Sequence, residues 1–525
     1  MVFYPFRIGY LCRPLESIMT DSKVRVRFAP SPTGPLHMGG VRTALYNYLF
    51  AKNQGGTFIL RVEDTDQKRY VPGAEEYIQQ ALKWCGIEPQ EGQGYGGDKG
   101  PYRQSERKDM YAQYAFQLIE SGNAYYTFDS EEAVQALRAA AEAEKKTWQY
   151  DASTRMSLKN SLTLSKEETQ ELLDAGHPWT IRFKMPDDEA VVFNDLIRGS
   201  VSIQTAVLDD KVLLKQDGMP TYHLANIVDD HLMEISHVIR GEEWLPSAPL
   251  HVLLYRALGW EAPQFAHLPL ILKPTGNGKL SKRDGDKGGF PIFPLEWKDP
   301  ASGNVSSGYK ESGYFPEAFI NMLLMLGWNP GTEQELFSLD EAVSAFSLDR
   351  VVKSGARFNP DKAKWFNENY LRQYSSSELA ELVKPLATEK GIDLSDEKLV
   401  SLCGMMAERS VFIQDLLAAN YFFGRPTEYD AKTVKKKWKE NTPTIMKELM
   451  TELEACEPFT EERVEVEFKA FLERKELGFG AALPGFRLLA TGAAGGPSMF
   501  AIAAFLGKEE TLARMNEGLT ALAAQ

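Results

Sequence analysis

The stretch KVRVRFAPSPTGPLHMGG, residues 23–40, predicts a strand, a turn-rich loop and the first turn of a helix in immediate succession. Apolar and basic residues alternate over 24–28, which is the period-two pattern of a strand. Prolines and a Pro-Thr-Gly turn follow, and Gly39 and Gly40 open the helix. A strand that enters a helix through such a turn directs backbone N–H groups and the positive helix end at one place. The stretch therefore predicts a phosphate-binding loop that His37 can reach, although a lone histidine beside two glycines is more often structural.

The residues that follow alternate between helix and strand patterns. Apolar residues recur at helical spacing over 41–49, a nearly continuous apolar strand follows at 57–62, and a second amphipathic helix begins near Ala74. An unbroken apolar strand is typical of a parallel strand that is buried on both faces. This order predicts an α/β domain with a parallel sheet. From about residue 130 a charged helix and short strands predict an insertion, and the chain after about residue 330 is helical by pattern.

Composition restricts the class of protein. Of the 525 residues 43% are hydrophobic and 25% are charged, and no apolar run reaches the length of about 18 residues that a membrane-spanning helix needs. The cysteines Cys12, Cys85, Cys403 and Cys456 lie far apart, which excludes a Cys-x-x-Cys zinc site and favours a reducing, cytoplasmic compartment. The net charge of −14 argues only weakly against a nucleic-acid partner, because binding depends on the local field of one surface.

Residues 1–22 are predicted to be an N-terminal extension that is disordered or precedes the natural start of the chain. They contain Arg7 and Arg13 and no acidic residue before Glu16, but they lack the continuous apolar segment of a secretory signal. An organelle presequence is an alternative, although prolines and a glycine would interrupt its helix. We favour Met19 as the natural start.

A second stretch with chemically useful residues is LKPTGNGKLSKRDGDKGG, residues 272–289. It places Lys279, Lys282 and Arg283 on a glycine-rich segment, and such a segment can close over a triphosphate. It is not a Walker loop, because the first glycine and the final hydroxyl residue of that pattern are both missing. A flexible, solvated lysine loop is the alternative interpretation.

Carboxylates follow the second predicted strand in RVEDTD, residues 61–66. In an open parallel sheet, ligands bind beyond the carboxyl ends of the strands. Glu63, Asp64 and Asp66 can therefore hold a substrate amino group or a metal ion there. Alternatively, they only cap the next helix.

Taken together, these stretches resemble a known family. HMGG after the first strand and KLSKR beyond the insertion resemble the two signature sequences of class I aminoacyl-tRNA synthetases, His-Ile-Gly-His and Lys-Met-Ser-Lys-Ser. The match narrows to the glutamyl-tRNA synthetase family of bacterial type, and it covers residues 23–515. The stretches that carry it are RFAPSPTGPLHMGG, RVEDTD, FNDLIRG, TYHLANIVDDHLMEISHVIRGEEW, KLSKRDGD, GYFPEAFINMLLMLGWNPG, FNPDKAKWFNENYL and RLLATGAAGGPSMFAIAAFLGKEE. Gly40, Leu280 and Arg283 depart from the signatures, but such variants are common among glutamyl enzymes.

The resemblance implies an α/β fold: a Rossmann-like parallel-sheet catalytic domain with an inserted α+β domain, followed by an all-helical C-terminal anticodon-binding region. The expected divisions are the extension 1–22, the catalytic domain 23–115 with 206–270, the inserted acceptor-stem-binding domain 116–205, a stem-contact region 271–355 carrying the KLSKR loop, and the anticodon-binding domain 356–525.

The resemblance also implies the reaction. It is the ATP-dependent ligation of L-glutamate to the 3′ end of tRNA(Glu) through a glutamyl-adenylate, with Mg²⁺ on the ATP phosphates, for protein synthesis in the cytoplasm. Some members bind zinc through cysteines, but residues 124–130 of this chain contain none, so we expect no zinc site. We expect a monomer with no membrane partner. Whether tRNA(Gln) is also charged with glutamate stays open.

By the same resemblance, the candidate residues form two sets. The catalytic set, of which all but Ser281 are expected to bind ATP, is His37, Gly39, Gly40, Lys279, Ser281 and Lys282. The glutamate-binding set is Arg27, Ala29, Ser31, Glu63, Tyr222, Asn226 and Arg240. Arg27 and Arg240 would bind the two carboxylates, and Glu63 would meet the ammonium group. Among the remaining histidines, His223 lies near the site or in the core, and the expected structural ones are His231, His237, His251 and His267.

Several alternatives remain. A glutaminyl-tRNA synthetase is disfavoured because its anticodon region is a pair of β-barrels, whereas the C-terminal third here is helical by pattern. A metabolic nucleotidyltransferase would be shorter. A catalytically inactive tRNA-binding paralogue is disfavoured because His37, Lys279 and Lys282 are all present. The basic run at 432–440 is interpreted as a solvated helix face rather than an RNA contact.

Overall fold

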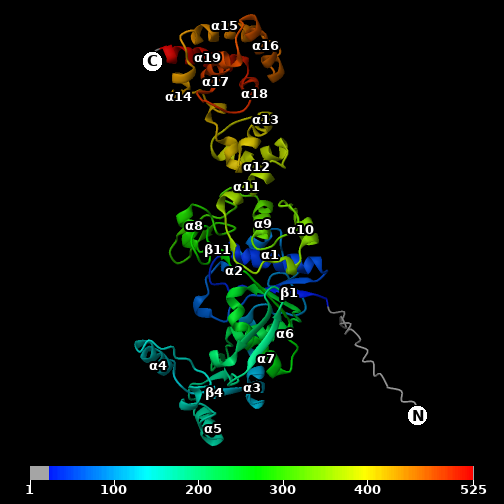
Figure 1. The fold of residues 1–525 in the computed structure, drawn as a ribbon, viewed down its shortest axis with the longest axis vertical. Helices are drawn as coiled ribbons and strands as arrows, with labels where there is room; N and C mark the ends of the chain where they lie inside the picture. Colours follow the sequence, from blue (N-terminus) through cyan, green and yellow to red (C-terminus); the bar gives the residue numbers. More distant parts are fainter. Residues whose placement is uncertain (1–22, 524–525) are drawn as a thin grey trace, which may run out of the picture. The chain divides into compact units, whose positions relative to one another are not determined.

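The computed structural model describes residues 23–523, and the predictions for residues 1–22 concern residues outside this range. The described chain divides into two compact units. The first unit consists of residues 23–272 and Leu324–Ala356, and the second consists of Lys273–Leu323 and residues 357–523. The chain therefore leaves the first unit after Leu272 and returns to it at Leu324 (Figure 1).

The first unit is built on parallel strands, as the sequence predicts. β1 (Arg25–Phe28), β2 (Thr57–Leu60) and β3 (Glu91–Gly92) form one parallel sheet. The helices α1 (Met38–Asn53) and α2 (Ala74–Trp84) connect successive strands of this sheet. β1 and β2 are buried over most of their length; the nearly continuous apolar sequence of β2 predicts this, whereas β1 alternates and buries Arg27 as well.

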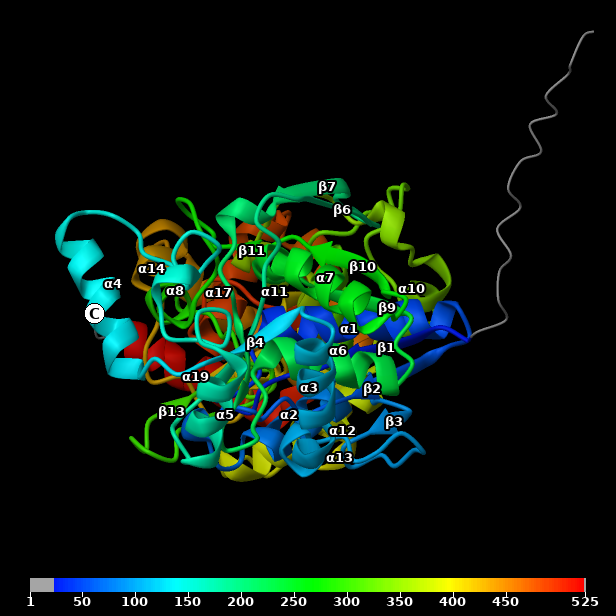
Figure 2. The ribbon, with the colours of Figure 1, turned by 90° about the horizontal axis from the view of Figure 1, so that it is seen from below.

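A second group of strands continues the first. β6 (Ala190–Asp195), β10 (Gln264–Leu268) and β9 (His237–Gly241) are parallel, and β7 (Gly199–Gln204) lies antiparallel at the edge. The backbone N–H of Ser236, just before β9, donates to the carbonyl of Arg25 at 3.0 Å and links the two groups. Figure 2 shows the strands following one another as β7, β6, β10, β9, β1, β2 and β3.

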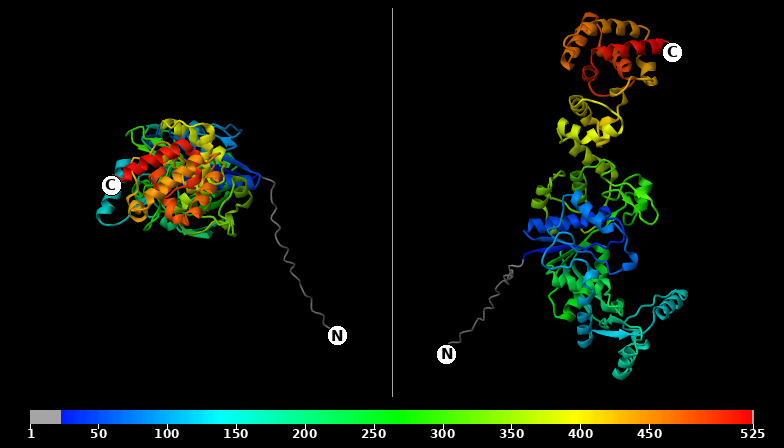
Figure 3. Two further views of the ribbon diagram at one scale, coloured as in Figure 1. Left: turned by 90° about the horizontal axis from the view of Figure 1, so that it is seen from above. Right: turned by 180° about the vertical axis from the view of Figure 1, so that it is seen from behind.

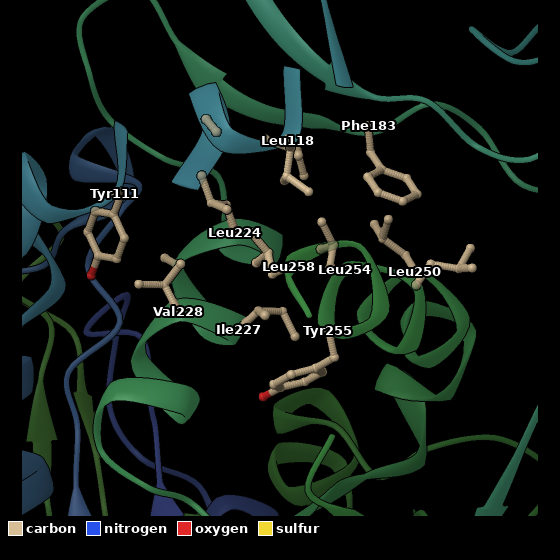
Figure 4. Packing of buried hydrophobic residues seen from close by; sticks show 14 of the residues in the cluster. Tyr111, Leu118, Phe183, Leu224, Ile227, Val228, Leu250, Leu254, Tyr255 and Leu258 are labelled. Atoms are coloured by element: carbon tan, nitrogen blue, oxygen red, sulfur yellow. The ribbon is translucent and has the colours of Figure 1, made fainter. Parts of the chain in front are cut away.

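The core of this unit lies against the helices α6 (Tyr222–Leu232) and α7 (Ala248–Leu258). Leu224, Ile227 and Val228 of α6 face Leu254 and Tyr255 of α7 (Figure 4). These side chains are almost completely buried, so truncating one of the leucines to alanine would cost about 2–5 kcal/mol. The packing fixes α6 and therefore the polar residues on its other face.

The inserted region carries a three-stranded antiparallel sheet of β4 (Ala124–Thr127), β5 (Thr180–Phe183) and β8 (Val212–Lys215). The helices near it are α3 (Ala112–Glu120), α4 (Glu131–Ala143) and α5 (Lys166–Asp174). This division differs from the expected insertion at 116–205: β8 lies beyond it, whereas β6 and β7 lie within it but join β10. The reason is non-local, because Phe193 of β6 packs against Phe265 of β10 at a centroid distance of 5.9 Å.

The segment Leu324–Ala356 completes the surroundings of α1. The guanidinium of Arg42 donates to the carbonyl of Leu326 at 2.8 Å, and the hydroxyl of Tyr46 donates to the carbonyl of Leu324 at 2.9 Å. Arg42 and Tyr46 are both buried. The acceptors of Arg42 Nη1 and of the Tyr46 hydroxyl are therefore backbone carbonyls that follow them by almost 300 residues.

The second unit is helical after residue 357, and no strand occurs between 358 and 523 (Figure 3, yellow to red). This confirms the predicted helical C-terminal region. Its helices are α11 (Pro360–Leu371), α12 (Ser376–Glu389), α13 (Asp396–Met406), α14 (Ala431–Lys437), α15 (Thr442–Ala455), α16 (Glu461–Arg474), α17 (Phe479–Thr491), α18 (Met499–Leu506) and α19 (Lys508–Ala523).

The remaining elements are short. They are β11 (Ile271–Leu272), α8 (Lys282–Gly288), β12 (Trp297–Lys298), β13 (Val305–Ser306), α9 (Pro316–Met325), α10 (Leu339–Ala345) and β14 (Ala356–Arg357). Across residues 23–523, no helix combines the length and the apolar character that crossing a bilayer requires.

Candidate active site

His37 caps the N-terminus of α1, at the end of the loop that follows β1. Its backbone is extended, and its Nδ1 accepts a hydrogen bond from the backbone N–H of Gly39 at 3.0 Å. A nitrogen that accepts carries no proton, so the neutral imidazole holds its proton on Nε2. The His37 side chain is exposed. It therefore presents an N–H group beside the positive end of a 16-residue helix.

Local packing favours glycine at positions 39 and 40, whether or not a ligand binds there. A Cβ on Gly39 would lie 2.8 Å from Cε1 of His37, and a Cβ on Gly40 would overlap the side chain of Leu36. Real Cβ atoms do not approach other atoms this closely. A side chain at either position would therefore displace the His37 ring or the Leu36 side chain from the positions seen here.

Four charged side chains form a buried cluster at the carboxyl ends of β1 and β2. Arg27 donates from Nε and Nη2 to the two oxygens of Asp230, at 3.0 and 3.3 Å. Arg61 donates to Asp230 at 2.7 Å and to Glu63 at 2.8 Å. We call Arg27, Arg61, Glu63 and Asp230 the carboxylate-paired cluster. Burial alone would raise the pKa of Asp230, but the two guanidinium groups outweigh burial and lower it below its ordinary value.

Some hydrogen-bonding groups of the carboxylate-paired cluster have no partner in the described part of the chain. The two N–H groups on Nη1 of Arg27 donate no hydrogen bond to any atom of residues 23–523. Asn226 of α6 donates to Oε1 of Glu63 at 3.0 Å, the same oxygen that Arg61 contacts. Oε2 of Glu63 accepts no hydrogen bond from any described residue. The cluster therefore offers unused cationic donors at Arg27 and an unused anionic acceptor at Glu63.

The other two carboxylates of the RVEDTD stretch are occupied by local structure. Asp64 accepts from the backbone N–H and the hydroxyl of Ser105, at 2.8 and 2.6 Å. Asp66 forms an exposed ion pair with Arg69 at 2.7 Å. Asp64 and Asp66 are thus engaged by local structure, although Asp66 at the start of the next helix makes no capping hydrogen bond, whereas Glu63 belongs to the candidate site.

Arg240, on β9, has a different environment from Arg27. Its Nε donates to Nε2 of His267 at 3.0 Å, and its Nη1 donates to Nδ1 of His251 and to the hydroxyl of Tyr222, both at 3.2 Å. Its Nη2 makes one long contact, 3.4 Å, to the carbonyl of Trp244. We call Arg240, Tyr222, His251 and His267 the imidazole-supported cluster. No carboxylate of the described chain lies within ion-pair distance of Arg240, although this side chain is only 5% exposed.

Tyr222 connects the two clusters. Burial raises its pKa above the ordinary value, and charges from both clusters act on it: Arg240 and Arg27 lower the pKa, whereas Glu63 raises it. Its ring lies 4.4 Å from that of Trp244, centroid to centroid, and Trp244 is 40% exposed. The two clusters therefore meet around Tyr222, at the N-terminus of α6.

Ala29 and Ser31 lie on the loop between β1 and α1. Ala29 is half-buried and Ser31 is exposed. The loop is held by the backbone N–H of Glu63, which donates to the carbonyl of Pro30 at 3.0 Å, and by Thr33, which donates to the carbonyl of Ser31 at 2.9 Å. This places the loop alongside Glu63, at the same edge of the sheet as the carboxylate-paired cluster.

The predicted residues Lys279, Ser281 and Lys282 belong to the second unit. All three are exposed. Ser281 precedes α8, and both its hydroxyl and its backbone N–H donate to Asp284, at 2.5 and 2.9 Å. The hydroxyl of Ser281 thus holds the start of α8, and Lys282 is the first residue of that helix rather than part of a loop.

Sequence reasoning missed four residues that support the candidate site. They are Arg61, Asp230, His251 and His267, and the last two were expected to be structural only. The sequence did not decide whether His223 lies near the site or in the core. Its Nδ1 lies within hydrogen-bond distance, 3.2 Å, of Nε2 of His251, so His223 contacts the imidazole-supported cluster. The sequence held no signal for His267, because its place beside Arg240 depends on the register between β9 and β10.

A resident metal site is not evident. Within residues 23–523, no three His, Cys, Asp or Glu side chains are grouped so that they could hold a metal ion.

Comparison with known families gives this geometry a context. The family model described as tRNA synthetases class I (E and Q), catalytic domain, matches residues 23–365, and the model described as anticodon binding domain matches residues 378–519. The glutamate–tRNA ligase of Christiangramia forsetii is 56% identical over 503 residues, which cover 96% of this chain and all of that protein. The chain belongs to the glutamate–tRNA ligase family. The relative from Phocaeicola vulgatus is 57% identical over 508 residues, again covering 96% of this chain and the whole relative.

Solved structures of the glutamate–tRNA ligase family agree with the fold. A crystal structure of a glutamate tRNA ligase from Elizabethkingia meningosepticum, in complex with its amino acid, has a TM-score of 0.93 and 51% identity. The alignment covers 95% of this chain and 100% of that one. Glutamate-tRNA synthetase from Elizabethkingia anophelis matches with a TM-score of 0.91. These comparisons confirm the family and the fold class that the sequence motifs predict.

Proposed function

We propose that this chain ligates L-glutamate to the 3′ end of tRNA(Glu), using ATP and passing through a glutamyl-adenylate. The observation that carries the amino-acid specificity is the buried Arg240 guanidinium, which contacts two imidazoles, a tyrosine hydroxyl and a carbonyl but no carboxylate. A buried cation without an anionic partner is costly, and a bound carboxylate would remove that cost.

The charges of the two clusters favour glutamate over glutamine. In the carboxylate-paired cluster two guanidinium groups are matched by two carboxylates, whereas Arg240 is unmatched. Glutamate carries two carboxylates and one ammonium group and so brings one net negative charge, while glutamine brings none. Glutamate therefore balances the site, and glutamine would leave the Arg240 charge buried and unpaired. We assign carboxylate binding to Arg27 and Arg240, with Tyr222 between them.

The ammonium group of glutamate fits the carboxylate of Glu63. Its Oε2 accepts no hydrogen bond from residues 23–523, and Asn226 together with Arg61 holds the other oxygen in place. A carboxylate fixed in this way needs little reorganisation when a cation binds. We assign the adjacent loop residues Ala29 and Ser31 to the wall of the same site.

We assign ATP binding to the start of α1 and to the KLSKR segment. The exposed His37 ring lies beside the positive end of α1, which suits phosphate oxygens, and at Gly39 and Gly40 no side chain stands between the backbone and a ligand. Lys279 and Lys282 would neutralise charge on the triphosphate. We expect Mg²⁺ to arrive with ATP, because Mg²⁺ commonly binds through substrate phosphates and keeps several waters.

The chemistry requires positioning rather than a general base. An oxygen of the glutamate α-carboxylate attacks the α-phosphorus of ATP, and pyrophosphate leaves. A ribose hydroxyl at the tRNA 3′ end then attacks the activated carbonyl carbon, and AMP leaves. A carboxylate is already a nucleophile, so the first step needs the two reactants held in line and the phosphate charge stabilised.

The helical region offers a place for the tRNA. A cleft of about 670 Å³ lies between α13 and α18, within the residues matched to the anticodon-binding family. Its charged lining residues are Glu397, Lys398, Glu408, Arg409 and Glu461. Because carboxylates outnumber cations there, an uncharged base suits the cleft better than a phosphate does. We assign this cleft to anticodon bases.

We further propose that the enzyme acts as a monomer in the cytoplasm. Charging of tRNA(Gln) with glutamate is the second candidate activity, and the same site would serve it, because only the tRNA differs.

The test is charging of total bacterial tRNA with labelled glutamate and, separately, labelled glutamine, in the presence of ATP and Mg²⁺. We expect glutamate to be attached and glutamine to be ignored. Repeating the assay with purified tRNA(Glu) and tRNA(Gln) separates the two candidate activities. Attachment of glutamine, or ATP binding without any charging, would contradict the assignment of Arg27 and Arg240.

A further inference from the structure

A continuous line of hydrogen bonds runs through the imidazole-supported cluster and ends at Asp195. Arg240 Nε donates to Nε2 of His267 at 3.0 Å, and Nδ1 of His267 lies 2.6 Å from Oδ2 of Asp195. Both His267 and Asp195 are inaccessible to solvent, with exposed fractions of 0% and 1%. Asp195 therefore reaches Arg240 only through the imidazole, and it cannot neutralise the side of the guanidinium that faces away from His267.

The direction of each hydrogen bond follows from the chemistry of arginine. A guanidinium can only donate, so Nε2 of His267 must accept and carries no proton. The single proton of the neutral ring is then on Nδ1, where it donates to Asp195. This is the one tautomer of His267 that satisfies both neighbours. Burial is the main cause that lowers the pKa of His267, which keeps the ring neutral and able to accept.

Asp195 is itself fixed by the turn between β6 and β7. Its Oδ1 accepts from the backbone N–H groups of Ile197 and Arg198, at 3.0 and 2.8 Å. Its Oδ2 accepts from the backbone N–H and the ring of His267, at 3.1 and 2.6 Å. The carboxylate is thus an acceptor in every contact. An amide in its place could keep the turn with its oxygen but would have to turn its NH₂ group toward His267.

We propose that Asp195 is a positioning residue for amino-acid recognition, acting through the tautomer of His267 to hold Arg240 in the orientation that binds a substrate carboxylate. The inference rests on the proposed function, because it assumes that Arg240 binds glutamate. Arg240 has neutral neighbours on its other side as well: Nδ1 of His251 accepts from Nη1, so the remaining proton of His251 points to His223. Every support of Arg240 is therefore an uncharged acceptor, which leaves its full charge for the substrate.

The direct test is Asp195→Asn, which can keep the two turn contacts of Oδ1 but replaces Oδ2 and so also removes an acceptor of the His267 backbone N–H. The asparagine NH₂ would donate to Nδ1 of His267, which moves the ring proton to Nε2 and sets two donors against each other at Arg240. We expect the KM for glutamate to rise by about tenfold or more, with the KM values for ATP and tRNA unchanged. An unchanged glutamate KM in a variant that charges tRNA would overturn the proposal.

A second variant separates tautomer control from simple packing. In His267→Gln, the amide oxygen stands near the former Nε2 and can still accept from Arg240, so we expect a smaller rise in glutamate KM than in Asp195→Asn. In the double variant the misplaced ring proton is absent, and the KM should return to that of His267→Gln alone. Additive or larger losses in the double variant would show that Asp195 does not act through His267 and would overturn the proposal.

Two controls keep the outcome readable. Asp210→Asn makes the same change at a buried aspartate just before β8 of the inserted sheet, where it contacts Arg155, Tyr125 and the backbone of Met185. We expect it to lower the melting temperature without raising the glutamate KM. The wild-type enzyme serves as the second control: failure of wild type to charge tRNA with glutamate would reject the proposed function, whereas normal wild-type activity with normal Asp195→Asn kinetics would reject only this inference.

Discussion

The two buried guanidinium groups of the site are stabilised in opposite ways. Arg27 is held by the carboxylate of Asp230, which it shares with Arg61, and the three groups are almost fully buried. Arg240 is held by neutral acceptors, two imidazoles and a tyrosine hydroxyl. The carboxylate-paired cluster balances its own charge and therefore suits a structural role with unused donors at the edge. The imidazole-supported cluster orients its cation without balancing it, which suits recognition of an anion.

The largest expected effect concerns the carboxylate-paired cluster. Asp230→Asn removes the charge that two buried guanidinium groups share, and breaking a buried ion pair of this kind costs about 3–5 kcal/mol. We expect a correspondingly lower free energy of unfolding, measured by urea denaturation at neutral pH. Stability equal to that of the wild type would mean that Arg27 and Arg61 do not depend on Asp230.

The second prediction concerns the imidazole-supported cluster. Arg240→Ala should lower kcat/KM for glutamate by about a hundredfold or more, because a buried charge-assisted contact to the substrate is worth about 2–5 kcal/mol. Its effect on the free energy of unfolding should stay below that of Asp230→Asn, since the variant removes an unmatched buried charge as well as some packing. Steady-state charging and urea denaturation of the same preparations test both parts.

Arg240→Ala could instead destabilise the enzyme as much as Asp230→Asn and leave glutamate kinetics near normal. The imidazole-supported cluster would then have a structural role and not a role in recognising the substrate. Arg27→Ala provides a matched variant, because it should affect both stability and glutamate use.

A substitution in the second unit leaves both arginine clusters intact and so tests ATP binding separately from glutamate binding. Lys282→Ala should slow adenylate formation by about tenfold, the loss expected for one charge-assisted contact to a phosphate, with little change in tRNA affinity. Pre-steady-state formation of the adenylate in the presence of tRNA measures the first quantity, and a filter-binding titration measures the second. Unchanged adenylate formation would remove Lys282 from the ATP site.

The smallest expected effect is a pH dependence of the free energy of unfolding, which arises from the histidines in and next to the imidazole-supported cluster. Burial lowers the pKa of His223 to about 4 and also lowers the pKa values of His251 and His267, while a histidine in the unfolded chain has a pKa of about 6.5. The unfolded chain therefore binds protons first as the pH falls. Stability should be complete above about pH 6.5 and should decline between pH 6.5 and 4.

Melting temperatures measured at intervals across this range test the expectation. His223→Asn should reduce the slope, because it removes one of the titrating groups. A melting temperature that rises on acidification from pH 6.5 would contradict the assignment of neutral imidazoles around Arg240.

The sequence predicted the parts of this molecule that depend on local pattern. The order of strand, turn and helix over residues 23–53 follows from alternation, prolines and glycines, and the α/β fold and the family are confirmed. The roles of Arg27, Glu63 and Arg240 remain predictions, but their proximity in space agrees with the set that the motifs named. Asp230 could have been suspected, because an acidic residue on the buried side of α6 requires a cationic partner.

The partners of Arg240 were not predictable in the same way. His267 and Asp195 meet because β10 lies between β9 and β6, an order that places residues from three distant segments in one layer. The same non-local pairing explains why β6 and β7 belong to the parallel sheet rather than to the insertion. A pattern read along one chain contains periodicity but not the order in which strands pair.

The return of the chain at Leu324 has a consequence for biosynthesis. On the ribosome, α1 is made early, yet Tyr46 donates to the carbonyl of Leu324, and Arg42 donates to the carbonyl of Leu326 as well as to that of Pro269. Until Leu324 and Leu326 leave the exit tunnel, the nascent catalytic half holds an arginine and a tyrosine without all of their final acceptors. A nascent chain arrested before residue 324 should therefore be more sensitive to proteases than the finished unit.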